Sequence, residues 1–228
     1  MSSAFPRLVR RYLFAQRLIH WIGVALFFML LFSGIVLLFL PLSFLAAGGF
    51  SRFIHQNAAI PFVMLPIVYA ILLPTQTKEL LIESFTFTRE DLKWFTYMPT
   101  YMLGRTHSLP PQGRLNAGQK LHHASTFLMF VTVSASGFAL WLGKGRLGAN
   151  GLACTAMVHD LSMLGLSVLM LGHVYFTFLY DAFSAMRNGF VTEEYARMEH
   201  RLWFETLPPE AFTVAPAASA MWRQKQAI

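Results

Sequence analysis

The stretch Gly151–Asp181, GLACTAMVHDLSMLGLSVLMLGHVYFTFLYD, is long and apolar enough to cross a bilayer, yet it carries His159 and His173. At ~100° and ~1.5 Å per residue, the spacing of fourteen positions makes about 1400°, within ~40° of four full turns, and rises about 21 Å. One helix face therefore presents two imidazoles at two depths. Because polar groups in hydrocarbon are costly unless satisfied, such histidines usually face the bundle interior and serve a function.

The composition places the whole chain in a membrane. Its 228 residues are 55% hydrophobic and only 13% charged, whereas soluble domains carry about 25% charged residues. The formal net charge is +7, but the basic residues lie at the ends of apolar runs, so loop placement explains them better than nucleic-acid binding. The single cysteine, Cys154, excludes an internal disulfide and an iron–sulfur cluster built from this chain alone.

The fold class that we expect is an all-α integral membrane protein with four spanning helices, because a hydrocarbon core of ~30 Å takes about 20 apolar residues. We place these helices near residues 17–40, 53–73, 118–142 and 152–181. The first run has no charge from Leu18 to Leu40, which is longer than the ~7–15-residue core of a signal peptide, so it is expected to remain uncleaved. Residues 1–207 would form this membrane domain and residues 208–228, rich in Ala and Pro, a tail.

The distribution of Lys and Arg predicts the orientation. Four lie in the segment through Arg17, six in the 74–120 connection and five after Asp181, which makes fifteen, against three in the two other connections. Cytoplasmic loops carry the excess of positive charge. Both termini and the long connection are therefore expected in the cytoplasm.

Two segments outside the spans show helical signals. Thr88-Arg-Glu-Asp91 is a helix-start pattern followed by aromatic residues, which predicts a short interfacial helix. Residues 182–205 combine mixed charge with large apolar side chains and predict a cytoplasmic C-terminal amphipathic helix.

With this topology the histidines sort by depth. His20 and His173 fall on the cytoplasmic side, and His55 and His159 on the opposite side. Two imidazoles are too few for a tetrahedral zinc centre, whereas haem iron needs only two axial ligands because the porphyrin supplies four. The spacing therefore predicts two haems, each with both axial positions filled, and so a role in electron transfer.

Neighbouring residues agree with this interpretation. Arg17 and Arg52 each precede a proposed ligand by three residues and could pair with haem propionates. Gly34 lies fourteen residues after His20, and Gly137 fourteen after His123, which leaves gaps for a flat macrocycle. Alternatives remain for the other histidines. Either His122 or His123 could replace an inner ligand, while His107 and His200 are expected to be solvated or at a partner interface.

The chain resembles the cytochrome b (gamma) subunit of membrane-bound respiratory formate dehydrogenases over most of its length. The shared motifs are Gln16-Arg-Leu-Ile-His20-Trp21, Phe53-Ile-His55, Arg114-Leu-Asn-Ala-Gly-Gln-Lys120, Gly172-His-Val-Tyr175 and Glu199-His-Arg-Leu-Trp203. The R-x-x-H-W motif also resembles cytochrome b subunits of nickel–iron hydrogenases and thiosulfate reductases.

The resemblance implies four spanning helices and two b haems whose ligands match His20, His55, His159 and His173. It also implies a quinone site beside the inner haem, which carries over to Asn116, Gly118, Gln119 and Lys120 in the N-A-G-Q-K run. Menaquinone or ubiquinone would be the electron acceptor. The quinone would bind from the lipid and take its protons from the cytoplasm.

We therefore expect an electron-transfer subunit of a respiratory chain in a bacterial inner membrane. Electrons would arrive from an iron–sulfur (beta) subunit, and formate chemistry would belong to a catalytic (alpha) subunit within a higher oligomer. One charge moved through the field is worth about 2.3 kcal/mol per 100 mV, so the transfer would conserve energy. Rival interpretations are a hydrogenase or sulfur-compound reductase subunit, a haem-free anchor or proton-coupled transporter, and a structural subunit with peripheral haem.

Overall fold

The computed structural model describes residues 7–105, 109–180 and 182–214, and His107 lies outside them. Four described helices are long and apolar enough to cross a membrane, as the hydropathy predicts: α1 (Phe14–Leu38), α3 (Phe50–Leu72), α7 (Ala117–Leu142) and α8 (Ala149–Leu179). Each begins within three residues of its predicted start. α3 continues through Pro61 and Pro66, as spanning helices can when neighbouring groups satisfy the freed carbonyls.

The outer faces of these helices are apolar. Phe32 is 62% exposed, Ile71 73% and Leu171 71%. Monomeric soluble proteins rarely leave such continuous apolar surface in water. The chain is therefore a multi-pass membrane protein whose helices present side chains to lipid or to other subunits.

The described chain forms two compact units. The bundle unit holds Leu18–Phe85 and Leu121–Tyr175, and the sheet unit holds the N-terminal part through Arg17, Thr86–Lys120 and the part from Phe176. In the bundle unit, Phe27 of α1, Val133 of α7 and Leu166 of α8 form a buried core. Phe62 of α3 packs against it, so all four long helices meet there.

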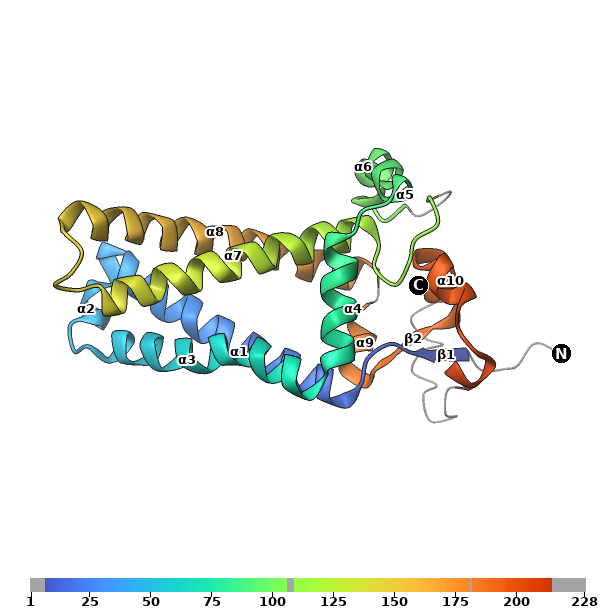
Figure 1. Ribbon diagram of the computed structural model, residues 1–228, viewed down its shortest axis with the longest axis horizontal. Helices are drawn as coiled ribbons and strands as arrows, with labels where there is room; N and C mark the ends of the chain where they lie inside the picture. The colour runs from blue at the N-terminus through green and yellow to red at the C-terminus, as the bar shows by residue number, and fades with distance from the viewer. Residues whose placement is uncertain (1–6, 106–108, 181, 215–228) are drawn as a thin grey trace. The chain divides into compact units, whose positions relative to one another are not determined.

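Short helices connect the spans. η1 (Leu40–Leu42) and α2 (Ser43–Ala46) join α1 to α3, and α4 (Pro74–Phe85), which the sequence did not predict, runs across the direction of the long helices in Figure 1. α5 (Arg89–Trp94) begins with a capping box between Thr88 and Asp91, which confirms the predicted helix start. η2 (Phe95–Tyr97) and α6 (Met98–Tyr101) follow it.

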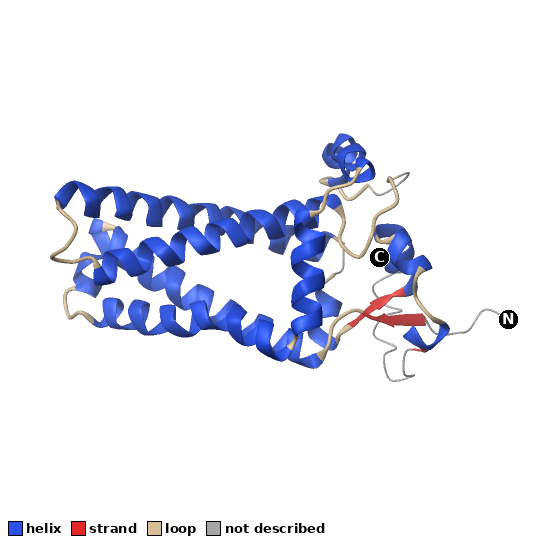
Figure 2. Cartoon of the chain, viewed as in Figure 1, coloured by secondary structure: helices blue, strands red, loops and turns tan. Residues whose placement is uncertain are grey.

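The sheet unit contains a small antiparallel sheet that the sequence did not predict. β1 (Arg7–Arg10) lies between β2 (Phe190–Thr192) and β3 (Phe212–Val214), as Figure 2 shows in red. In the register, Leu8 stands opposite Thr192 on one side and Thr213 on the other. β3 falls within the expected tail, whose residues after 214 lie outside the described part.

The prediction of a single C-terminal amphipathic helix is wrong. The segment divides into α9 (Phe183–Asn188), β2, α10 (Glu193–Glu199) and α11 (Arg201–Glu205), followed by η3 (Pro209–Ala211). Gly189 ends α9 at φ +91°, a left-handed conformation that favours glycine. A Cβ there would lie 2.7 Å from the Tyr12 carbonyl oxygen, so the chain turns closely past the N-terminal segment.

Candidate functional site

The bundle unit brings together the two histidine pairs that the spacing predicts. The ring centres of His20 and His173 are 6.2 Å apart, with an angle of 58° between the ring planes. Those of His55 and His159 are also 6.2 Å apart, at 71°. α8 supplies one histidine to each pair, while α1 and α3 supply the others.

The separation within each pair suits an iron between two imidazoles. Two iron–nitrogen bonds of about 2.0–2.1 Å, with ~1.1 Å from each nitrogen to its ring centre, span about 6.3 Å. Within the described residues, no three His, Cys, Asp or Glu side chains gather as a metal site of protein ligands alone would need. The pairs therefore fit a metal whose other ligands come from a macrocycle.

Ser33 fixes the orientation of the His55 ring. The Ser33 hydroxyl donates to the Met29 carbonyl oxygen at 2.6 Å, and its Oγ lies 3.0 Å from His55 Nδ1. Because the hydroxyl hydrogen is already used, Oγ accepts from a protonated Nδ1. This tautomer leaves the Nε2 lone pair for a metal, in the way that metal-bound histidines are usually held.

His159 is held in the same manner from α7. Its Nδ1 donates to the Val133 carbonyl oxygen at 3.0 Å, and Ser136 Oγ lies 3.3 Å away. The glycine after each serine allows the close approach: a Cβ on Gly34 would lie 3.3 Å from the His55 ring, and one on Gly137 3.1 Å from the His159 ring. The sequence analysis missed both serines, although the repeated Ser-Gly dipeptide marks them.

The alternative inner ligands are also close. The His122 ring stacks on that of His173, with ring centres 5.4 Å apart and planes at 15°. This separation is shorter than the span of about 6.3 Å for an iron between two imidazoles, so the distances favour His20 as the partner of His173. His123 Nδ1 lies 3.4 Å from Ser84 Oγ.

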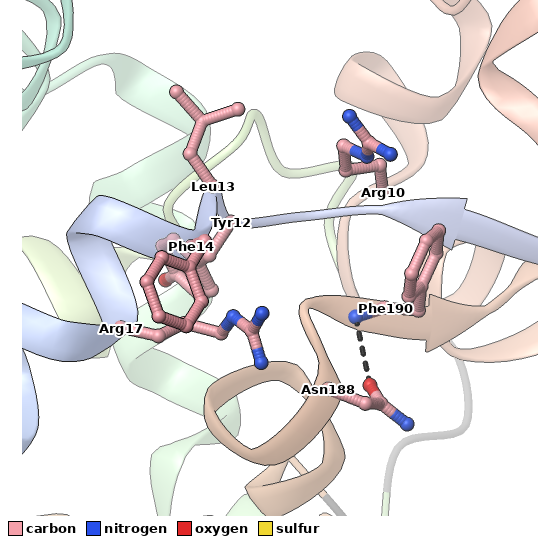
Figure 3. Close-up of a pocket in the computed structure, with 7 residues that line it drawn as sticks. All are labelled: Arg10, Tyr12, Leu13, Phe14, Arg17, Asn188 and Phe190. Carbon is pink, nitrogen blue, oxygen red and sulfur yellow. Dashed lines mark hydrogen bonds between the residues drawn. The ribbon is translucent and has the colours of Figure 1, made fainter.

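The two predicted propionate partners differ in their surroundings. Arg17 Nη1 donates to the Arg187 carbonyl oxygen at 2.7 Å, which ties the start of α1 to the last turn of α9. Figure 3 shows Arg17 in a pocket lined by Arg10, Tyr12, Leu13, Phe14, Arg17, Asn188 and Phe190. Arg52 is exposed in the first turn of α3. Pairing with propionates stays a prediction for both arginines.

In the sheet unit, the N-A-G-Q-K run begins α7. Asn116 Oδ1 accepts from the Gln119 backbone N–H at 2.9 Å, and Gln119 Oε1 accepts from the Asn116 N–H at 3.1 Å. This reciprocal capping satisfies donors that a helix start leaves free. Asn116 is only 2% exposed and its Nδ2 donates to the Tyr101 hydroxyl at 3.2 Å. Its side chain also hydrogen bonds Glu199.

Gly118 and Lys120 pack tightly in the same run. A Cβ on Gly118 would lie 2.9 Å from the buried Trp94 ring. Lys120 Nζ lies 2.7 Å from Asp91 Oδ2 and donates to the Thr86 carbonyl oxygen at 3.1 Å. Burial by itself raises the pKa of Asp91, but the hydrogen bonds from Lys120 and Thr88 outweigh it and hold that pKa below its ordinary value. These contacts hold the start of α7 against α5.

The Glu199-His200 motif is buried, which corrects the expectation of a solvated or interfacial His200. His200 is 0% exposed and its Nδ1 hydrogen bonds the Gly113 carbonyl oxygen at 2.9 Å. Glu199 is 5% exposed and accepts from the Tyr101 hydroxyl at 3.1 Å. Burial raises the pKa of Glu199 to about 7, against the opposing hydrogen bonds from Tyr101 and Asn116.

Comparisons with known proteins give a matching family model and several similar relatives. A family model described as prokaryotic cytochrome b561 matches residues 11–189. The cytochrome b556 subunit of formate dehydrogenase from Haemophilus influenzae is 24% identical over 195 residues, which cover 82% of this chain and 79% of that protein. The cytochrome b556(Fdn) subunit of the nitrate-inducible formate dehydrogenase from Escherichia coli is 23% identical over 217 residues, covering 88% and 92%.

Proposed function

The chain belongs to the prokaryotic cytochrome b561 family, and from that premise we propose that it is the two-haem electron-transfer subunit of a formate dehydrogenase complex. The family implies b-type haem, and the four apolar helices supply the membrane bundle that holds it. The number of haems, the partner and the electron acceptor are the parts that we add.

The observation that carries the proposal is the pair of equal separations. Two histidine pairs, each with ring centres 6.2 Å apart, support two irons with both axial positions filled. Fourteen residues of α8 separate His159 from His173, a rise of about 21 Å. Two haems at these depths would place two electron carriers across most of a hydrocarbon core of ~30 Å.

Each haem, when bound, supplies an iron that accepts and releases one electron. The chain contributes the histidine nitrogens, the oxygen atoms of Ser33, Val133 and Ser136 that accept hydrogen bonds from two of the rings and orient them, and apolar surroundings. Closed axial positions exclude oxygen as a ligand. The site therefore suits electron transfer and not oxygen activation.

We assign the electron acceptor as a quinone, menaquinone or ubiquinone, bound at the start of α7. The amide side chains of Asn116 and Gln119 support this assignment because both lie at a helix N-terminus, which favours a hydrogen-bonded carbonyl oxygen. Gly118 packs closely against Trp94, and Lys120 pairs with Asp91. These contacts fix the conformation of that turn. Electrons would come from an iron–sulfur subunit, and formate oxidation would occur on a catalytic subunit.

The first test is the visible spectrum of the purified chain, expressed with ample haem supply. We expect reduced-minus-oxidised α and Soret bands and a stoichiometry of two haems per chain. A colourless polypeptide would exclude the proposal and favour the anchor or transporter interpretation. One haem per chain would exclude the two-site form.

The second test identifies the partner. Purification through a tag on this chain is expected to recover an iron–sulfur subunit and a formate-oxidising subunit, together with formate-dependent quinone reduction. Recovery of a hydrogenase or a sulfur-compound reductase would replace the formate assignment. The names of both similar relatives favour formate dehydrogenase.

A further inference from the structure

The sheet unit buries a group of polar side chains whose hydrogen-bonding capacity is only partly used. Among the described residues, Glu199 Oε1, His200 Nε2 and Arg11 Nη1 are buried without a hydrogen-bond partner. Nearly all buried polar atoms in native proteins are paired with protein or water. Several such atoms in one region indicate a polar interior that water can enter.

Glu199 is connected to Asn116 of the N-A-G-Q-K run, and another residue of its helix contacts Gln119. Its Oε2 accepts from the Tyr101 hydroxyl at 3.1 Å, and that hydroxyl accepts from Asn116 Nδ2 at 3.2 Å. On the same helix, α10, Tyr195 hydrogen bonds the Gln119 side chain. Asn116 also hydrogen bonds Glu199, so the acid contacts the side chain that we assign to the quinone.

Several of the other carboxylates described for this unit have cations beside them. Asp91 pairs with Lys120, Glu193 pairs with Arg7 and Arg197, and Glu205 pairs with Arg201. Within the described residues, Glu199 makes no ion pair, and its hydrogen-bond partners are a neutral phenol and a neutral amide. A buried acid of this kind can exchange a proton without breaking a salt bridge.

We propose that Glu199 carries protons to the quinone bound at the start of α7, with Tyr101 as the first group on the path. This proposal rests on the proposed function. Reduction of one quinone takes two electrons and two protons. The two proposed haems would supply the electrons. For each proton, the Glu199 O–H bond breaks, an O–H bond forms on a quinone oxygen, and the carboxylate then takes a new proton from water.

The groups facing Glu199 suit this role. Burial and the charge of Glu199 raise the pKa of Tyr101, and burial raises that of Tyr195, so both phenols stay protonated. Burial lowers the pKa of His200 well below its ordinary value, so the imidazole stays neutral. Arg11 is a cationic side chain that acts on His200. With a pKa of about 7, Glu199 is the member of this group that gains and loses a proton near neutral pH.

The test uses the purified complex with Glu199→Gln, which keeps the shape of the side chain and removes the exchangeable acid. We expect quinone reduction at pH 7 to fall at least tenfold, while haem content and the rate of haem reduction by formate stay as in the wild type. Glu199→Asp should retain activity with a shifted pH profile. Glu205→Gln, at an exposed pair with Arg201, is the matched control and should change nothing.

Wild-type rate and pH profile in Glu199→Gln would overturn the proposal and leave the proposed function standing. If the wild-type complex reduces haem but no quinone, the proposed function itself fails. If Glu199→Gln loses haem, Tyr101→Phe provides the second variant, because it removes the bridging hydroxyl and keeps the ring. Unchanged quinone reduction in Tyr101→Phe would then overturn the proton path.

Discussion

Ser33 Oγ lies 3.0 Å from His55 Nδ1, so a hydroxyl on α1 supports an imidazole on α3. The Val133 carbonyl oxygen, 3.0 Å from His159 Nδ1, gives the corresponding support from α7 to α8. One pair of proposed ligands thus has both rings fixed by hydrogen bonds from neighbouring helices. Such support raises the basicity of the ligand and stabilises the oxidised metal.

Ser33→Ala is therefore expected to raise the midpoint potential of the haem that we propose His55 and His159 to hold. A lost hydrogen bond is worth roughly 0.5–1.5 kcal/mol, which corresponds to about 20–60 mV for one electron. A redox titration followed in the visible spectrum measures the shift. Ser167→Ala is the control, because Ser167 donates only within its own helix, to the Met163 carbonyl oxygen at 2.9 Å. Equal potentials in wild type and Ser33→Ala would contradict a role for this hydrogen bond.

The inner ligands can be distinguished by two substitutions. His173→Ala should remove one haem together with quinone reduction, because it takes away an axial ligand. His122→Ala should keep both haems, because the ring centre of His122 lies 5.4 Å from that of His173, closer than an iron between the two imidazoles would allow, whereas that of His20 lies 6.2 Å away. Haem stoichiometry and the low-temperature spectrum of each variant show which of the two histidines is a ligand. Loss of a haem in His122→Ala with retention in His173→Ala would exchange their roles.

Hydropathy and helical spacing predicted the four spans and the histidine pairs because both are periodic properties of single helices. The sheet was not predictable in this way. β1 is four residues long and pairs with residues near 190 and 213, so no local alternation marks it. Likewise, the sequence around Gly189 does not predict that a residue in the left-handed conformation ends α9 close to Tyr12.

The N-A-G-Q-K run shows a second limit. The resemblance assigns it to a quinone, whereas the structure also gives it a part in helix capping. The Asn116-x-x-Gln119 pattern could have suggested the capping bonds, since a capping residue followed three positions later by Gln is a known helix start. The partners Trp94 and Tyr101 could not be predicted, because burial of distant aromatic side chains against a helix start leaves no local pattern.

Lys120→Met is expected to destabilise the sheet unit. It leaves Asp91 charged and buried without its cation, which costs about 3–5 kcal/mol. The matched control is Lys93→Met on α5, since its pair with Glu90 is exposed and worth about 0–1 kcal/mol. Thermal unfolding of the purified protein in detergent measures both. Similar midpoints for the two variants would contradict a stabilising Lys120–Asp91 pair.

The pH dependence of that pair has a defined sign. The pKa of Asp91 is lower in the folded protein than its ordinary value of 3.8. The folded state therefore binds fewer protons, and the stabilisation is present above that value and lost as the pH falls below it. Lys120→Met should remove the part of the stability loss at low pH that comes from protonation of Asp91.

Glu199 has the opposite sign. Its pKa is about 7 in the folded protein against an ordinary value of 4.5, so the folded state binds more protons and stability falls as the pH rises between these values. At about 1.4 kcal/mol per unit, the full effect is on the order of 3 kcal/mol. In Glu199→Gln the side chain cannot ionise. From pH 5 to pH 8 the unfolding midpoint of the wild type should therefore fall relative to that of Glu199→Gln. Parallel midpoints across this range would show that Glu199 does not titrate there, and that it cannot serve as the buried acid.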